Sequence, residues 1–237
     1  MNKNDVIVML ERLKSESFFS DFKLKKSDKS LIRKFDWGWQ RVRLDHYNGF
    51  DLEREDLALE VRPIYGIRFN IYHKWFEEYS VIDLKDQRDR STIGFSEEML
   101  GKPKNFHYCF LENRNNYELD YEVMKNNILK HASSVFTRFQ TLKDVYDYRI
   151  GDLLSGNLKR FNHGGDWIFE DMFLARMVSP QNYSKVKGAI LERFEAIYDN
   201  PYTRSSHMEI YHSRASEIIS YLESMPLDDI PQELIRK

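Results

Sequence analysis

The spacing of hydrophobic residues changes along the chain and separates a first part with strand-like spacing from a second part with helical spacing. Residues 4–13 place apolar side chains at helical spacing behind a polar cap at Asn4 or Asp5, which predicts a short helix. From Phe22 onward, apolar and polar residues alternate with a period of two, as in half-buried strands. The expected strands cover residues 22–26, 31–37, 39–46, 57–61, 67–73 and 81–84. For residues 85–117 we predict long loops, with one further strand as an alternative.

The second part, from about residue 121 to the end, carries apolar residues at helical spacing throughout. Its first apolar stripe consists of Met124, Ile128, Ala132, Val135 and Phe139. Thr141, with Asp144 three positions later, matches a capping box and predicts the start of the next helix. Because strands precede helices instead of alternating with them, the sequence predicts an α+β fold, with an N-terminal helix and antiparallel sheet followed by a C-terminal helical region. We expect a sheet region at 1–118 and a helical region at 119–237, packed on the sheet as one globular unit.

Composition and charge narrow the class of protein. The 237 residues are 41% hydrophobic and 31% charged, which is typical of a folded globular chain and excludes membrane and disordered proteins. No apolar run approaches the ~18 residues of a membrane span. The net charge of −2, with both signs interspersed, gives no general drive toward nucleic acid. Cys109 is the single cysteine, so an internal disulfide cannot form and we expect a cytoplasmic protein.

The strongest enzymatic pattern is an apolar run that ends at Asp83 and is followed, after one spacer, by Lys85. Restriction-type nucleases present their catalytic pair in this way, because the carboxylate holds Mg²⁺ and the cation positions the attacking water. A second acid is required, and nothing in the sequence selects among Asp45, Asp51 and Glu60. A strand that runs into a solvated turn explains the same pattern. Asp83 and Lys85 are therefore the candidate catalytic residues of an alternative hypothesis, a Mg²⁺-dependent nuclease-like hydrolase.

Three other motifs have simpler structural explanations. Residues 162–166 contain paired glycines before a helix start, but they lack the preceding strand and the Lys-Ser or Lys-Thr pair of a phosphate loop. His107 and Cys109 would face the same side of a strand, yet no third residue orients them, and a structural cysteine is expected. Glu209 and His212 have the Glu-x-x-His spacing of a di-iron bundle without the second pair that such a site needs. The sequence thus predicts neither a metal site nor a cofactor.

A run of aromatic and basic residues gives the best candidate for a binding surface. Tryptophan and arginine are enriched at the energetic centres of protein interfaces, and an aromatic-basic strip can also stack bases. Two tryptophans beside two arginines at a period of two do not fit easily into a hydrophobic core. The predicted strip consists of Trp37, Trp39, Arg41, Arg43 and Tyr47. We expect it to form an exposed recognition face of the sheet.

The order of these segments resembles a bacterial family known as domain of unknown function 4304. The resemblance covers roughly the first 150 residues and rests on several short segments. They are residues 22–26, 31–35, 37–40, 68–71, 123–139 and 141–144. The resemblance implies a bacterial source and an α+β fold, and it supplies no catalytic residues. Small proteins of this texture often look like immunity or accessory proteins encoded beside toxins, so the resemblance suggests such a role.

The abundance of Tyr, Trp and Arg and the lack of a complete catalytic set favour a non-catalytic binding protein. We expect it to recognise another macromolecule, in the first place a protein, through the aromatic-rich sheet face. The sequence contains no strong nucleic-acid signal and no membrane-spanning segment. The competing hypothesis remains the nuclease-like hydrolase centred on Asp83 and Lys85.

Overall fold

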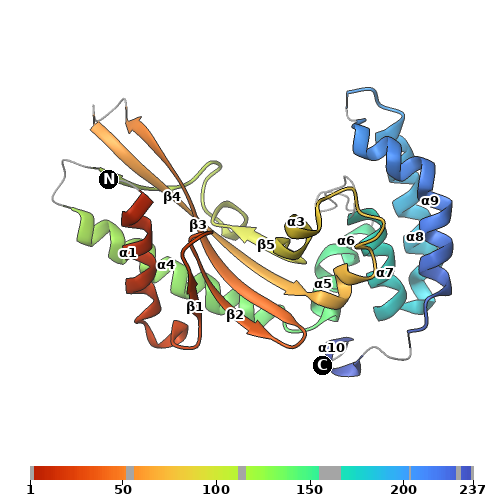
Figure 1. The fold of residues 1–237 in the computed structure, drawn as a ribbon, viewed down its shortest axis with the longest axis horizontal. Helices are drawn as coiled ribbons and strands as arrows, with labels where there is room; N and C mark the ends of the chain where they lie inside the picture. Colours follow the sequence, from red (N-terminus) through yellow and green to blue (C-terminus); the bar gives the residue numbers. More distant parts are fainter. Residues whose placement is uncertain are drawn as a thin grey trace. The chain divides into compact units, whose positions relative to one another are not determined.

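The computed structural model in Figure 1 describes residues 3–51, 56–111, 116–154, 167–202, 204–227 and 231–235. The chain divides into two units, each of which collects segments from separate parts of the sequence. The sheet unit comprises Met1–Arg68 and Ser91–Arg138, and the helical unit comprises Phe69–Arg90 and Phe139–Lys237. The expected α+β class is confirmed, with an antiparallel sheet in the first part of the chain and helices in the second. The division differs from the expected boundary after residue 118, because each unit takes in a segment from across that boundary.

The sheet unit is built on six strands. Neighbouring strands follow the order β1-β2-β3-β4-β5. Strand β6 also pairs with β4, along Ala58–Val61, whereas β5 pairs with β4 along Ile64–Ile67. The strands are β1 (Lys23–Lys25), β2 (Ser30–Phe35), β3 (Gly38–Asp51), β4 (Asp56–Phe69), β5 (Ile93–Ser96) and β6 (Tyr108–Leu111). The helices of the unit are α1 (Lys3–Lys14), η1 (Ser17–Phe19), η2 (Glu98–Leu100) and α4 (Tyr117–Arg138).

One face of this sheet carries the core of the unit. Leu31, Val42 and Leu44 are buried on β2 and β3, and alternate residues of β4 continue the same apolar face. Helices α1 and α4 pack together here, since the Tyr121 hydroxyl of α4 donates a 3.3 Å hydrogen bond to the Met9 carbonyl of α1. The predicted apolar stripe of α4 is buried along its whole length. Burial of these side chains supplies the main driving force for the unit.

The helical unit surrounds a central helix. It contains α2 (Asn70–Lys74), α3 (Leu84–Asp89), α5 (Leu142–Arg149), α6 (Gly151–Leu154), α7 (Trp167–Val178), η4 (Pro180–Asn182), α8 (Tyr183–Tyr198), α9 (Ser206–Ser224) and α10 (Gln232–Ile235). Helix α7 contacts α2, α5, α8 and α9, so it is buried on nearly every side. This position explains its strongly apolar sequence, because a helix that is enclosed all round needs no polar face.

Two predicted strands are wrong. The strand expected at 67–73 ends at Phe69, and α2 begins at Asn70. Its alternation breaks because the consecutive residues Tyr72 and His73 are both buried, whereas a half-buried strand buries every second residue. Residues 81–84 form a bend that leads into α3. The polar region after them contains two strands, β5 and β6, where one was considered.

The helix start predicted at Thr141 is confirmed in full. The Thr141 side chain accepts a hydrogen bond from the backbone N–H of Asp144 at 3.2 Å, and the Asp144 carboxylate accepts one from the Thr141 N–H at 2.8 Å. This reciprocal arrangement satisfies two N–H groups that the first turn of α5 leaves without intrahelical partners. Within the described ranges, no helix combines the length and the apolar character needed to cross a membrane.

Replacing Thr141 with alanine should lower the free energy of unfolding by about 1 kcal/mol, because the cap of α5 is lost. The matched control is Thr137→Ala, which makes the same change at an exposed position within α4. Chemical denaturation of both variants measures the difference. Equal stability of the two variants would show that the capping box contributes nothing.

Candidate functional site

The five residues of the predicted recognition strip do not form one exposed surface. Trp39 is 7% exposed and Arg41 is 6% exposed, and the Arg41 guanidinium lies over the Trp39 ring at 4.4 Å. A Cβ at Gly66 would come within 3.2 Å of the Trp39 ring, so this glycine lets the indole lie flat against β4. Trp39 and Arg41 therefore belong to the interior, contrary to the expected exposed face.

The other basic and aromatic residues of the predicted strip, Arg43 and Tyr47, lie farther along β3. Arg43 pairs with Asp45 on the same strand, with 2.7 Å between Nε and Oδ1. The Tyr47 hydroxyl lies 2.8 Å from Nδ1 of His107, and Nε2 of His107 lies 3.0 Å from Oε2 of Glu60. Burial, together with the hydrogen bond to Glu60, raises the pKa of Tyr47 to about 12, so its phenol stays protonated at neutral pH.

The same contacts bear on the hypothesis of an activated thiolate at Cys109. Cys109 lies opposite Glu60 in the β4–β6 register, so the structure does bring a thiol, a carboxylate and the His107 imidazole to one part of the sheet. The His107 ring, however, uses its nitrogen atoms toward Tyr47 and Glu60. An activated thiolate needs an imidazole directed at the sulfur, whereas the described contacts of this imidazole are to Tyr47 and Glu60.

The end of the β2–β3 hairpin carries a stack of aromatic and cationic groups that we call the aromatic ladder. It consists of Phe22, Arg33, Phe35 and Trp37. The Arg33 guanidinium lies 4.8 Å from the Phe22 ring centroid and 5.3 Å from that of Phe35. The rings of Phe35 and Trp37 then stack with centroids 4.6 Å apart and planes 7° from parallel. Sequence analysis found only Trp37, although the period-two spacing of Arg33, Phe35 and Trp37 was a usable signal.

Polar contacts fix the guanidinium at the centre of the aromatic ladder. Arg33 donates from Nη1 to Asp21 at 2.8 Å and from Nη2 to Gln40 at 2.6 Å. The ladder runs from the buried ring of Phe22, which is 1% exposed, to Phe35, which is 37% exposed. Trp37 is half-buried at the turn. The rings of Phe35 and Trp37 thus stack near the surface. The Arg33 guanidinium next to Phe35 is held in place by its contacts with Asp21 and Gln40.

The candidate catalytic residues Asp83 and Lys85 lie at the start of α3 and not at the end of a strand. Asp83 and Lys85 are both exposed, at the start of a helix that is only six residues long. Asp45 and Glu60 belong to the sheet unit, and the side chain of Asp51 lies outside the described part. Across the described ranges, no group of three or more His, Cys, Asp or Glu side chains could hold a metal ion. The strand that the nuclease hypothesis requires is not formed.

Of the other two motifs, only the pair of Glu209 and His212 lies within the described residues. Residues 162–166 lie outside the described residues. His212 stacks on Tyr198, with ring centroids 3.9 Å apart, and its Nε2 lies 3.0 Å from Glu195 on the adjacent helix. Its imidazole thus serves a surface contact between α8 and α9, as expected for a helix-surface histidine.

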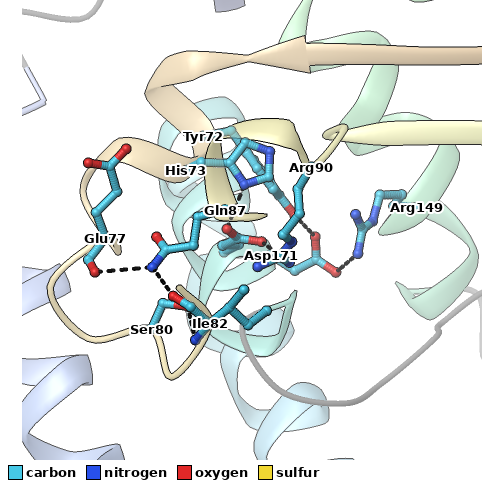
Figure 2. Close-up of polar contacts among 10 residues, drawn as sticks. Tyr72, His73, Glu77, Ser80, Ile82, Gln87, Arg90, Arg149 and Asp171 are labelled. Carbon is cyan, nitrogen blue, oxygen red and sulfur yellow. Dashed lines mark hydrogen bonds and ion pairs between the residues drawn. The ribbon is translucent and has the colours of Figure 1, made fainter. Parts of the chain in front are cut away.

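Sequence analysis missed a set of buried charges in the helical unit, which we call the ionic network (Figure 2). Glu170 and Asp171 are consecutive residues of α7 and are 2% and 1% exposed. Nδ1 of His73 lies 2.7 Å from Glu170, and Arg90 lies 3.3 Å from it. The other members are Tyr72, which donates to Asp171 at 2.7 Å, and Arg149, which donates to it at 2.9 Å.

The two neighbouring carboxylates have opposite pKa shifts. Burial alone would raise the pKa of Glu170, but the attraction of His73, the hydrogen bond from it and the charge of Arg90 hold that pKa below 4.5. Burial raises the pKa of Asp171 above 3.8 against the opposing effects of Arg149 and Tyr72. Burial also keeps the pKa of Tyr72 well above 10, so its phenol remains a hydrogen-bond donor.

The network acts as a structural tie within the helical unit. Tyr72, His73 and Arg90 come from the segment 69–90, and their partners Glu170 and Asp171 lie on α7. Arg149 at the end of α5 also pairs with Asp171. Trp167 covers both guanidinium groups, at 5.0 Å from Arg90 and 4.3 Å from Arg149. Gln87 extends the tie by donating to the backbone carbonyl of Ile82 (Figure 2). Buried ion pairs of this kind fix which segments pair, even where their net stabilisation is small.

The sheet unit also contains a buried carboxylate, that of Glu97. Glu97 is fully buried and accepts hydrogen bonds from the hydroxyl groups of Tyr65 and Tyr108, the latter at 3.1 Å. Nδ1 of His131 lies 3.1 Å from the same carboxylate. These contacts join β4, β6 and α4 around one charge, so we assign Glu97 a structural role as well.

Comparison with known proteins adds no assignment: no family model, curated protein or solved structure matches this chain. The resemblance to the domain of unknown function 4304 family therefore stays a prediction.

Replacing Glu170 with glutamine should lower the free energy of unfolding by about 3–5 kcal/mol at neutral pH, because its buried ion pairs with His73 and Arg90 are lost. The control is Glu192→Gln, an exposed position on α8, for which we expect a change within about 0.5 kcal/mol. Chemical denaturation measures both. A loss for Glu170→Gln as small as that of the control would show that the ionic network does not hold the helical unit together.

The two carboxylates should respond to pH in opposite directions. The folded pKa of Glu170 lies below 4.5, so its stabilisation is present above 4.5 and is lost as the pH falls. The folded pKa of Asp171 lies above 3.8, so its contribution is present below 3.8 and is lost as the pH rises through that folded pKa. Unfolding free energies of the wild type, Glu170→Gln and Asp171→Asn, measured across this range, test the signs. Parallel trends in the two variants would contradict the assignment.

Proposed function

We propose that this chain is a non-catalytic binding protein that recognises a protein partner through the exposed end of the β2–β3 hairpin. The observation that carries the proposal is the stacked pair of Phe35 and Trp37, held at the surface by the aromatic ladder. Aromatic rings at the centre of an interface, surrounded by polar groups, contribute most of the binding free energy in many protein complexes.

The surroundings of the ring pair support this use. Lys34 and Asp36 are exposed on either side of Phe35, which gives the apolar centre a polar rim of the kind found around interface hot spots. Arg33 is held by Asp21 and Gln40, so the rings lose little conformational freedom when a partner binds. Pre-organisation of this kind increases affinity, because less ordering accompanies association.

The proposal keeps the protein class predicted from the sequence, a non-catalytic binding protein, and changes the residues assigned to the binding surface. Trp37 remains in the binding surface, and Phe35 and Arg33 join it. Trp39 and Arg41 leave it because they are buried. The finer parts of the hypothesis are an immunity or accessory role, a bacterial source and a cytoplasmic location. They rest on the family resemblance and on the single cysteine.

Replacing Phe35 or Trp37 with alanine should weaken partner binding at least about tenfold while the chain stays folded. The partner is isolated from native-host lysate with the tagged protein, and its affinity for each variant is then measured by titration calorimetry. Circular dichroism and denaturation check the fold. The control is Tyr202→Ala, which removes a ring that is 97% exposed in the helical unit. Unchanged affinity in both hairpin variants would place the interface elsewhere.

A further inference from the structure

Charge is distributed unevenly over the sheet unit. The whole chain has a net charge of −2, yet the second face of the sheet, opposite the face that packs against α1 and α4, is rich in basic residues. Its accessible cations are Lys23, Lys25, Lys34, Arg43 and Arg62. The carboxylates that interrupt them on the strands are Asp45 and Glu60.

The strand register places these side chains on the same face. Lys23 lies opposite Ile32, and Ile32 lies opposite Arg41. Lys34 lies opposite Trp39. Because successive side chains of a strand point to opposite faces, these residues share one face and Leu31 and Val42 share the other.

Two glycine positions connect β4 to the same face. A side chain at Gly66 would contact the ring of Trp39, and a side chain at Gly49 would lie 3.4 Å from Oε1 of Glu60. The even-numbered residues of β4, Arg62 among them, therefore lie on the face that carries the lysines.

Among the accessible cations of this face, Lys23 and Lys34 have no counter-charge within ion-pair distance among the described residues. Lys25 pairs with Asp28 at 2.8 Å, and Arg43 pairs with Asp45. Lys23 and Lys34 are both exposed, and their positions on adjacent strands are diagonal neighbours, roughly 7–8 Å apart. Like charges at this separation repel each other, and an acidic group placed against both would relieve the repulsion.

We propose that the partner presents an acidic protein surface to Lys23 and Lys34 while its apolar centre covers Phe35 and Trp37. This inference rests on the proposed function and names the chemistry of the partner. Lys34 lies between Arg33 and Phe35 in β2 and points to the opposite face, so the partner surrounds the end of the hairpin. An interface of ordinary size, roughly 800 Å² on each side, is large enough for this.

The same face is poorly suited to nucleic acid. Single-stranded nucleic acid binds on several exposed rings that stack against bases, but on this face Trp39 is buried under Arg41, and of these two β3 rings only that of Tyr47 is exposed. The carboxylates of Asp45 and Glu60 lie among the cations and would repel a continuous chain of phosphates. A protein partner needs carboxylates only at the two lysines.

The test uses labelled poly-L-glutamate as the acidic probe and a single-stranded DNA oligonucleotide of equal charge as the competing probe. Fluorescence anisotropy measures the affinity of each at about 0.01 M and about 0.15 M ionic strength. We expect the full chain to bind poly-L-glutamate more tightly than DNA, with affinity that falls as salt increases. The double variant Lys23→Glu/Lys34→Glu should bind poly-L-glutamate at least about tenfold more weakly.

Two further variants control for charge and for folding. Lys130→Glu/Lys185→Glu makes the same change in net charge at exposed positions on α4 and α8, and it should lose much less affinity. Lys23→Gln/Lys34→Gln removes the charges without reversal and should weaken binding in the same direction, with an unchanged circular dichroism spectrum. Equal losses in the Lys23/Lys34 and control variants, or tighter binding to DNA than to poly-L-glutamate, would overturn the inference.

The partner isolated for the hairpin variants separates this inference from the proposed function. If Trp37→Ala releases the partner and Lys23→Glu/Lys34→Glu does not, the protein-binding function stands and the acidic partner is wrong. If poly-L-glutamate binds at Lys23 and Lys34 but Phe35 and Trp37 affect no protein partner, the basic surface stands and the proposed use of the hairpin end is wrong.

Discussion

The pairing of Glu170 and Asp171 with cations from distant segments is the interaction on which the helical unit depends. Both carboxylates lie inside the apolar helix α7, where an unpaired charge is strongly unfavourable. Their hydrogen bonds and ion pairs are complete only when the segment 69–90 and helix α5 are both in place. The apolar contacts of α7 are compatible with several ways of packing the neighbouring helices, whereas the two buried carboxylates are compatible with very few.

The sheet unit follows the same principle with Glu97. Its carboxylate is satisfied by groups from β4, β6 and α4, so its burial is tolerable only in the native register of those elements. Each unit thus combines a large apolar core with one buried polar cluster. The core supplies the free energy of folding, and the cluster discriminates among ways of packing it.

The features proposed for function share no residue with either cluster. In the aromatic ladder the buried ring of Phe22 and the fixed guanidinium of Arg33 support Phe35 and Trp37, so part of the core stabilises the surface that we propose for binding. The basic second face adds charge next to those rings. Apolar contacts at the centre of such an interface would provide affinity, while the charges would guide association and exclude partners of the wrong sign.

The sequence by itself determined the α+β class, the apolar stripe of α4 and the capping box at Thr141. These features arise from side chains within a few positions of one another, so spacing encodes them directly. Tertiary structure decided that Trp39 and Arg41 are buried and that α2 replaces the end of a strand. It also decided the ionic network, in which His73 and Glu170 are 97 positions apart. No local pattern specifies such a pair, because its stability comes from the exclusion of water that only the assembled unit provides.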